Sequence, residues 1–413
     1  MSYLDIDLDL TDRECELRAA AHQFALEVLR PAAKSLDEQR ADEVVARGSL
    51  LWEVLRKAYR LGYHTVGIPE AVGGQGFTPR ERHIVSEELG WGCSGLAIAI
   101  GVASFPFQAA ALSGNPGLID TYVRPFVRDT EARLVGCWAG TEPNHGSDFI
   151  TLGSPDHRDP AIVPDVRARL EGDHWVIRGQ KSSWVSLGTI ATHALAFLSV
   201  DPARGMSGNG VAVIPLEQPG ISKGPALNKL GQRPLNQGEI FFDDVRIPRD
   251  HMLVGPEGYE IYVDAILAGA NALMGATFTG VARAAFEEAL AYSKTRIQGG
   301  KPLCEHQLVQ KDLFQMFTKV EAARRLSRAA FAYNSQTLPP ATEYSIAAKV
   351  FCTQAAFEVS STALQIHGGY GLSKEYVIEK LFRDARASLI EDGTNDVLGL
   401  AAARMLVARY GMA

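Results

Sequence analysis

The spacing of hydrophobic and polar positions changes twice along the chain. Through residues 1–131, apolar residues recur every three or four positions, as in "ECELRAAAHQFALEVLRPAAKSLDEQ" (14–39) and "SLLWEVLRKAYRLGY" (49–63). This spacing predicts amphipathic helices. Thr11 and Glu14 precede the first run with the spacing of a capping box, so we expect a helix to begin there.

Between residues 132 and 250 the pattern changes to short runs of β-branched and aromatic residues separated by turn residues. Examples are "HWVIRG" (174–179), "HALAFLSV" (193–200) and "GEIFFDDV" (238–245). Such runs predict β-strands, and "EGD" (171–173) between two of them predicts a hairpin tip. Helical spacing returns after residue 251 and predicts long helices over 258–296, 306–334 and 342–367.

These patterns predict an α+β protein in three parts. An N-terminal helical domain is expected over 1–131, a central β domain over 132–250 and a C-terminal helical domain over 251–413. The first C-terminal helix carries small residues on more than one side, which is typical of close helix packing in a bundle.

Composition excludes several classes of protein. The 413 residues are 46% apolar and 22% charged, with a formal charge of −7, which are ordinary values for a folded protein. No sustained basic face is present, which argues against nucleic-acid binding. The uncharged stretch "CSGLAIAIGVASFPFQAAALSG" contains Gly, Ser and Pro and lacks the flanks of a membrane span, so we expect it to be buried instead.

The chain start and the cysteines add two expectations. The start "MSYLDIDLDLTDRE" is acidic and lacks the basic-then-apolar order of a signal peptide, which predicts a cytoplasmic protein. The five cysteines are far apart and show no CxxC spacing, so we expect neither a metal site nor a disulfide framework.

Three stretches carry candidate chemistry. "CWAGTEPNHGSD" (137–148) offers backbone N–H groups and hydroxyls with little bulk, which suits a flat polar ring or a phosphate, although an ordinary polar loop has the same composition. "GQKSSWVSLG" (179–188) alternates polar residues with Trp184 and by itself indicates only a strand edge. "EDGT" (391–394) places two acids before the last helix, where Thr394 or Asn395 can cap; taken alone, Asp392 could equally be that cap.

Taken together, these stretches resemble the acyl-CoA dehydrogenase family. "GTEPNHGSD", "GQKSSWVS" and "QIHGGYGLSKEYVIEKLFRDAR…EDGT" occur in the family's order and at its separations, and "LGQRPLNQGEIFFDDVRIP" and "RIQGGKPLCEHQ" resemble further family segments. The resemblance covers nearly the whole chain. It implies an N-terminal helical domain, a central β-barrel-like domain and a C-terminal four-helix-bundle domain.

The resemblance also implies FAD as the cofactor and assigns its contacts. Trp138, Gly140 and Thr141 are expected at the pyrimidine side of the flavin. Ser147 is expected to reach either its pyrophosphate or the phosphopantetheine of the bound thioester. The remaining expected contacts are Trp184 and Ser186 at the ring, Arg296 and Gln307 supplied by a neighbouring subunit, Gln365, Gly368 and Gly369 at the adenosine and pyrophosphate, and Thr394 and Asp396 at the last helix.

The family base is usually a glutamate directly before Gly-Thr, and here that position holds Asp392. The reaction needs a carboxylate to remove the proton beside a thioester carbonyl while hydride leaves for flavin N5. Aspartate is one methylene shorter, and a misplacement of about 1 Å can cost ~10²-fold in rate. Asp392 is the expected base and Glu391 the alternative, and a third possibility is that neither acts.

Other family members carry the base on the first C-terminal helix, where this chain has Ala270, and the neighbouring arginine of the family reads Asn271. The resemblance implies Ser147, Asn271 and Gly393 as the substrate contacts. Loss of the arginine together with the shorter base predicts a reshaped acyl pocket. Gly101 and Ala103 are small and are expected to leave space in it for a branched, cyclic or otherwise non-linear acyl group.

The implied activity is FAD-dependent α,β-desaturation of an acyl-CoA, with no metal, with an electron-transferring flavoprotein as acceptor and in a homotetramer. Three alternatives stay open: a dehydrogenase acting on a carrier-protein-bound acyl group, a flavin oxidase of the same fold that resembles nitroalkane oxidases, which use aspartate as base, and a scaffold that has lost catalysis. The complete set of expected flavin contacts argues against the scaffold.

Overall fold

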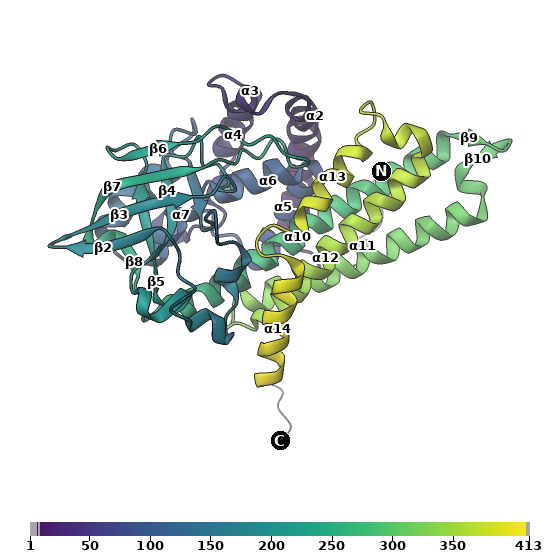
Figure 1. Cartoon of the computed structure of the whole chain (residues 1–413). Helices are drawn as coiled ribbons and strands as arrows, with labels where there is room; N and C mark the ends of the chain where they lie inside the picture. Colours follow the sequence, from purple (N-terminus) through teal and green to yellow (C-terminus); the bar gives the residue numbers. More distant parts are fainter. Residues whose placement is uncertain (1–5, 7–8, 410–413) are drawn as a thin grey trace.

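The N-terminal part is an assembly of mostly short helices in a computed structural model that describes residue 6 and residues 9–409 (Figure 1). The capping box is confirmed, because Glu14 N–H donates to Thr11 Oγ1 (3.2 Å) and Thr11 N–H donates to Glu14 Oε2 (2.8 Å). The helices are α1 Asp12–Phe24, α2 Arg30–Glu38, α3 Ala41–Val45, α4 Leu50–Arg60, α5 Pro79–Gly92, α6 Ser94–Val102, α7 Phe105–Leu112, α8 Pro116–Leu118 and α9 Arg124–Val127.

The predicted helix over 14–39 is interrupted by a π-helical turn, Ala25–Leu29, between α1 and α2. Pro31 stands directly beyond this turn and has no N–H to donate, so the regular hydrogen-bond pattern cannot continue through it. A second π-helical turn, Ile119–Val123, precedes Pro125 in the same way. The sequence pattern shows the helical spacing but not this local change of geometry.

The central part is a mixed sheet with the order β6-β7-β3-β2-β4-β5-β8, and β1 pairs in parallel with β4. The predicted hairpin is confirmed, with Glu171 opposite His174. The sheet is open among the described residues, so the barrel-like expectation is corrected: the edge strands β6 and β8 do not pair. The strands are β1 Gly136–Ala139, β2 Arg167–Glu171, β3 His174–Lys181, β4 His193–Ser199, β5 Asn209–Pro215, β6 Ile221–Lys223, β7 Ile240–Pro248 and β8 Met252–Val254.

The C-terminal part is a bundle of long helices, drawn in green and yellow in Figure 1. The bundle is crossed by α5 at very close range: a Cβ on Gly280 would lie 2.0 Å from Glu87 O, and one on Gly90 would lie 2.1 Å from Thr277 O. Only glycine permits this approach. The elements are α10 Tyr259–Thr295, β9 Ile297–Gln298, β10 Lys301–Pro302, α11 Gln307–Asn334, α12 Thr342–His367, α13 Ile378–Ser388 and α14 Asn395–Arg409.

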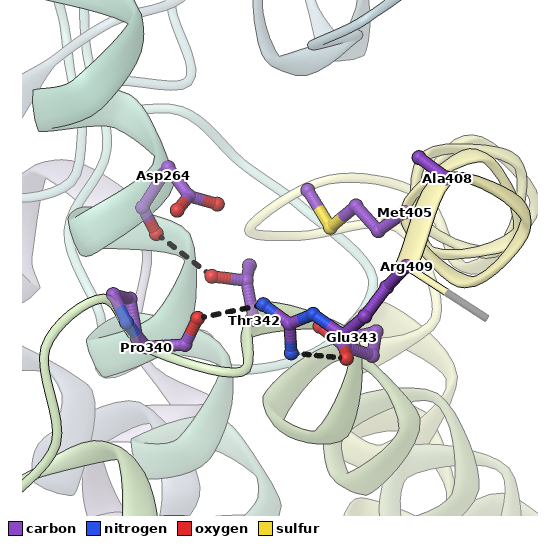
Figure 2. Close-up of a pocket in the computed structure, with 7 residues that line it drawn as sticks. All are labelled: Asp264, Pro340, Thr342, Glu343, Met405, Ala408 and Arg409. Carbon is purple, nitrogen blue, oxygen red and sulfur yellow. Dashed lines mark hydrogen bonds and ion pairs between the residues drawn. The ribbon is translucent and has the colours of Figure 1, made fainter. Parts of the chain in front are cut away.

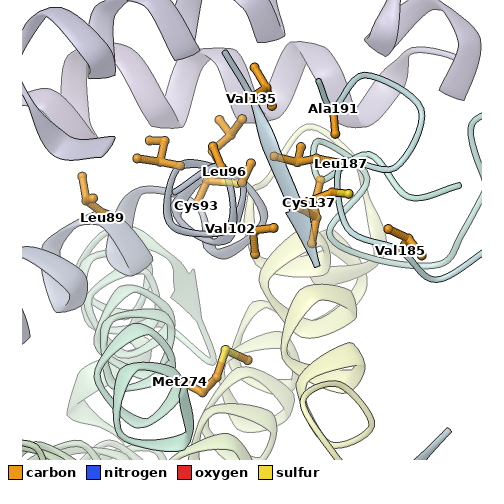
Figure 3. Packing of buried hydrophobic residues seen from close by; sticks show 14 of the residues in the cluster. Leu89, Cys93, Leu96, Val102, Val135, Cys137, Val185, Leu187, Ala191 and Met274 are labelled. Carbon is orange, nitrogen blue, oxygen red and sulfur yellow. The ribbon is translucent and has the colours of Figure 1, made fainter. Parts of the chain in front are cut away.

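One hydrophobic core runs through all three parts. Figure 3 shows Leu89 and Leu96 of the N-terminal helices, Cys137 of β1 and Met274 of α10 contributing to one region of it. The three parts therefore stabilise one another, and the segments between them are held in fixed positions.

Two apolar stretches, Ser94–Leu112 and Tyr259–Thr295, are long enough to cross a membrane, but most of their residues are buried inside the protein. Buried core helices pass the same length and composition test, so these stretches are weak evidence for a span. Half of the acidic start on which the cytoplasmic expectation rests lies outside the described residues, and that expectation stays a prediction.

Candidate active site

The two acids lie on the turn between α13 and α14. Asp392 has φ of 53° and Gly393 φ of 95°, so two successive residues occupy the left-handed region. Glycine is required at the second, because a Cβ there would lie 2.3 Å from Ile150 Cδ1. The helix cap is Thr394, whose Oγ1 accepts from Val397 N–H (3.4 Å). Asp392 is therefore not the cap of the last helix, and the alternative that it serves only as a helix cap is wrong.

Lys349 of α12 holds the turn over residues 391–394, the acid turn, in place. It is fully buried, and its Nζ donates to Gly393 O and to Asn395 Oδ1, both at 2.8 Å. Desolvation lowers the pKa of Lys349 to about 8, against the opposing charges of Asp392 and Glu391. The lysine thus links the backbone of the turn to the helix behind it.

Asp392 is open to solvent and its carboxylate accepts no hydrogen bond from the described residues. Protein nonetheless surrounds it on enough sides that desolvation raises its pKa, while Lys349 acts in the opposite direction. A carboxylate with a raised pKa and no bonded partner is a stronger proton acceptor than an ordinary surface aspartate.

Glu391 has a different environment from its neighbour. Its Oε1 accepts from Gln232 Nε2 (2.6 Å), an interaction across the boundary between the central and C-terminal parts. Desolvation and the charge of Asp392 raise the pKa of Glu391 to about 7. The two adjacent acids therefore differ: one is bonded and partly buried, and the other is free and solvent-facing.

The 140–148 loop meets the acid turn directly, since Thr394 N–H donates to Ser147 Oγ (3.0 Å). The loop is held from inside by a buried ion pair between Lys181 and Glu142 (2.7 Å). Lys181 Nζ also donates to Gly140 O (3.0 Å), and Glu142 Oε2 accepts from Val166 N–H (3.1 Å). This pair fixes the backbone on which Gly140, Thr141 and Ser147 stand.

The 182–186 stretch contacts the segment that contains Trp138 and Thr141. Trp184 leaves 56% of its surface exposed. Ser186 forms single antiparallel bridges with Trp138 on one side and with Gln237 on the other. Gln237 Nε2 donates to Ser186 Oγ (3.3 Å), and Ser182 Oγ donates to Thr141 Oγ1 (2.9 Å).

A second group of expected cofactor residues lies elsewhere on the chain. Gln365 and Gly368 follow Lys349 by sixteen and nineteen residues on α12 or at its end, about 24 Å along the helix axis for Gln365. Arg296, at the end of α10, lies over the Tyr370 ring at 5.3 Å. Gln365, Gly368 and Gly369 are exposed there, as are Arg296 and Gln307.

The expected substrate contacts have mixed surroundings. Asn271 is fully buried and donates to Leu267 O in its own helix (2.9 Å), while its Oδ1 accepts no hydrogen bond among the described residues. Gly101 has open space where a Cβ would point. Ala103 does not leave space as expected: it is fully buried against β1, and its carbonyl accepts from Gly136 N–H (2.9 Å).

A hollow elsewhere on the protein is not part of this site, and no metal site was found among the described residues. A hollow of about 340 Å³ lies at the far end of α14, lined by Asp264, Glu343 and Arg409 among others, with Arg409 and Glu343 ion-paired at 2.6 Å (Figure 2). None of its lining residues belongs to the acid turn. Within the described ranges, no cluster of His, Cys, Asp and Glu could hold a metal ion.

Sequence reasoning missed Gln232, Lys349 and the Lys181–Glu142 pair. Each acts through a contact between residues 39 to 159 positions apart. Lysine and glutamate in buried runs are an unusual composition, which is the only local signal that could have drawn attention to Lys181 and Lys349.

The residues fit a bound flavin. The exposed Trp184 ring offers an apolar face, Trp138 and Ser186 offer a backbone edge, and the Ser147 loop offers hydroxyl and N–H groups. At the second group, no atom lies within 4 Å of a Cβ placed on Gly368 or Gly369. Close backbone approach of a large cofactor is therefore possible at both places.

Comparison with known proteins agrees with these features. The sequence matches the acyl-CoA dehydrogenase N-terminal domain over residues 11–130, the middle domain over 137–245 and the C-terminal domain over 257–407. It is 31% identical to acryloyl-CoA reductase (NADH) of Anaerotignum propionicum, over 98% of this chain and 97% of that protein.

Solved structures show the same fold. Butyryl-CoA dehydrogenase of Megasphaera elsdenii is 28% identical with a TM-score of 0.84, covering 97% of this chain and 100% of that one. An active-site mutant of nitroalkane oxidase crystallized with 1-nitrooctane has a TM-score of 0.86 over 98% of this chain and 100% of that one, and at 23% identity this likeness shows the fold alone. The chain belongs to the acyl-CoA dehydrogenase family of FAD-dependent oxidoreductases.

Proposed function

We propose that the protein desaturates an acyl thioester between its α and β carbons, with Asp392 removing the α proton. The observation that supports this most strongly is the acid turn. Asp392 is free of hydrogen bonds and faces solvent, and the adjoining Thr394 N–H is bonded to Ser147 of the loop expected to meet the flavin. FAD, when bound, supplies the acceptor for the hydride from the β carbon.

The left-handed turn gives a reason for aspartate at this position. Asp and Asn tolerate positive φ better than other non-glycine residues, because their short polar side chains can bond locally. The turn lies directly before the helix cap and is held by Lys349, so the carboxylate position is set by the backbone instead of by a long side chain.

We propose a branched, cyclic or otherwise non-linear acyl group as the substrate. The support is the open space beside Gly101 on α6, together with Asn271 at the position where the family usually has an arginine and the shorter acid Asp392. Ala103 no longer supports it, since that residue is packed against β1.

A second candidate is a dehydrogenase or oxidase of the same fold acting on another activated carbon acid. The nitroalkane oxidase likeness concerns the fold, and the aspartate base is equally suited to that chemistry. A thioester on a carrier protein is the remaining possibility. We propose CoA and an electron-transferring flavoprotein as partners, and a homo-oligomer in which Arg296 and Gln307 serve the neighbouring subunit's cofactor.

The test is anaerobic mixing of the FAD-loaded protein with straight-chain, branched and cyclic acyl-CoA thioesters while the visible flavin band is recorded. We expect bleaching by the non-linear class, and a roughly 10²–10⁴-fold slower rate in Asp392→Asn. Faster bleaching by straight-chain thioesters would contradict the substrate proposal. A flavin that only a nitroalkane or a carrier-bound acyl group bleaches would favour the second candidates.

A further inference from the structure

Gln232 connects the central part of the chain to the acid turn, and its own backbone is in a strained conformation. It lies in the loop between β6 and β7, only 1% of its surface is exposed, and its φ of 49° is left-handed although it is not glycine. Such a conformation is disfavoured and persists where surrounding bonds fix it, and these positions concentrate at functional sites.

Gln232 accepts one local bond at its carbonyl, from Leu235 N–H (2.9 Å), and its N–H groups donate to the C-terminal part. Its backbone N–H donates to Asp384 Oδ1 (2.5 Å) and its Nε2 donates to Glu391 Oε1 (2.6 Å). Asp384 in turn is ion-paired with the buried Lys380 on the same helix. The amide is therefore anchored at its backbone and directed at the acid beside the expected base.

From this geometry we infer that Gln232 is a positioning residue that tethers the Glu391 carboxyl, so that Asp392 alone is free to accept the substrate proton. The inference rests on the proposed function for the role of Asp392. It adds a residue that acts through Glu391 and touches neither substrate nor cofactor in the proposed reaction. Asp392 has no bonded partner, whereas Glu391 is held at one oxygen.

Several charged groups lie around Glu391 and influence its pKa. Asp392 lies on the same turn, Lys349 on α12, Lys229 on the loop of Gln232, and the Lys380–Asp384 pair on α13. A hydrogen bond donated to a carboxylate favours its charged form. Removing the Gln232 amide therefore raises the pKa of Glu391 further above about 7.

Stability as a function of pH gives a readout that needs no substrate. The pKa of Glu391 is higher in the folded than in the unfolded protein, so protonated Glu391 favours the folded state. This contribution to the free energy of unfolding is complete at pH values below the unfolded-state pKa, and it is lost as pH rises through about 7. Gln232→Met keeps the length and unbranched Cβ of the side chain. We expect this variant to lower the Tm at pH 8 more than at pH 5, by roughly 1–2 °C for each unit of pKa change.

The control is Glu391→Gln, in which position 391 no longer titrates. We expect the pH-dependent part of the Gln232→Met effect to vanish in Gln232→Met/Glu391→Gln. An equal pH-dependent loss in both backgrounds, or none in either, would overturn the inference. Gln232→Asn is the second variant, since asparagine tolerates left-handed backbone but is too short to reach Glu391, and it should reproduce the effect of Met.

The positioning role is tested in the Asp392→Asn background with the acyl-CoA that bleaches the wild-type flavin fastest. At pH 9, where the released Glu391 is ionised, we expect Asp392→Asn/Gln232→Met to bleach at least about 10-fold faster than Asp392→Asn, because Glu391 can then take the proton. No gain would overturn the tether. If no acyl-CoA bleaches the wild type, the proposed function fails, while the stability comparison still decides whether Gln232 controls Glu391.

Discussion

At the residue scale, the acid turn is a balanced cluster of two carboxylates and two lysines. Asp392 and Glu391 are adjacent on the turn, while Lys349 and Lys229 approach from separate segments, and desolvation lowers the pKa of each lysine to about 8. These shifts bring Glu391 and both lysines close to a change of charge near neutral pH, while burial raises the pKa of Asp392 above its ordinary value. Groups poised in this way can transfer protons with small energetic cost.

Lys349→Met should move the pH dependence of flavin reduction. The base must be ionised, and Lys349 is the cation that opposes the rise in the pKa of Asp392. Without it the pKa of Asp392 rises further, so the pH of half-maximal reduction moves upward and the rate at neutral pH falls. Stopped-flow bleaching with one acyl-CoA between pH 5 and 9 measures this.

Lys319→Met is the matched control for that variant, because Lys319 pairs with Glu358 on the protein surface, away from the acid turn. Its pH profile should coincide with that of the wild type. A Lys349→Met profile with an unchanged midpoint would show that Lys349 serves only to hold the backbone of Gly393.

At the element scale, the 140–148 loop owes its shape to one buried ion pair. Lys181 and Glu142 each leave 1% of the side chain exposed and bond three separate segments. Lys181→Met leaves a buried carboxylate without its cation, which costs about 3–5 kcal/mol of unfolding free energy. Urea unfolding of the FAD-loaded protein measures it.

The double variant Lys181→Met/Glu142→Leu removes both charges and should recover much of that loss, since apolar replacement of a whole buried pair is often neutral. A double variant as unstable as Lys181→Met would mean that packing, not the lost charge balance, causes the destabilisation. FAD retention should follow the same order, because the pair holds Gly140 and Thr141.

The elements that could be predicted are those determined by neighbours in the sequence. The Thr11–Glu14 capping box and the 171–173 hairpin each depend on residues within four positions. The prediction that Ala103 leaves space in the acyl pocket was wrong, because the size of a residue does not show which way it faces. Ala103 lies between α6 and α7, and its carbonyl accepts a hydrogen bond from Gly136 N–H. Gln232 and Lys349 were not found because their partners lie 159 and 44 residues away, and local pattern contains no information on such pairing.

At the scale of the whole molecule, the expected cofactor contacts form two separated groups. Ser147 bonds the acid turn and Ser186 pairs with Trp138, while Arg296 and Gly368 lie at the other end of α10 and α12, on the side of β9 and β10 (Figure 1). The second group is exposed. A site shared between two subunits would require the expected cofactor contacts to be exposed and distant from the acid of the same chain, as this second group is.

Subunit complementation tests that arrangement. Arg296→Ala lies on the surface and should weaken FAD binding without unfolding the protein, and Asp392→Asn should retain FAD but lose proton removal. If Arg296 serves the neighbour's site, a mixed dimer has one site with both defects and one with neither. Co-expression of the two differently tagged variants, followed by tandem purification, should then restore up to about half of the wild-type bleaching per dimer, as the symmetry of the shared sites demands. If Arg296 serves the acid of its own chain, every site in the mixed dimer keeps one defect, and the mixture bleaches no faster than the average of the two single variants at limiting FAD.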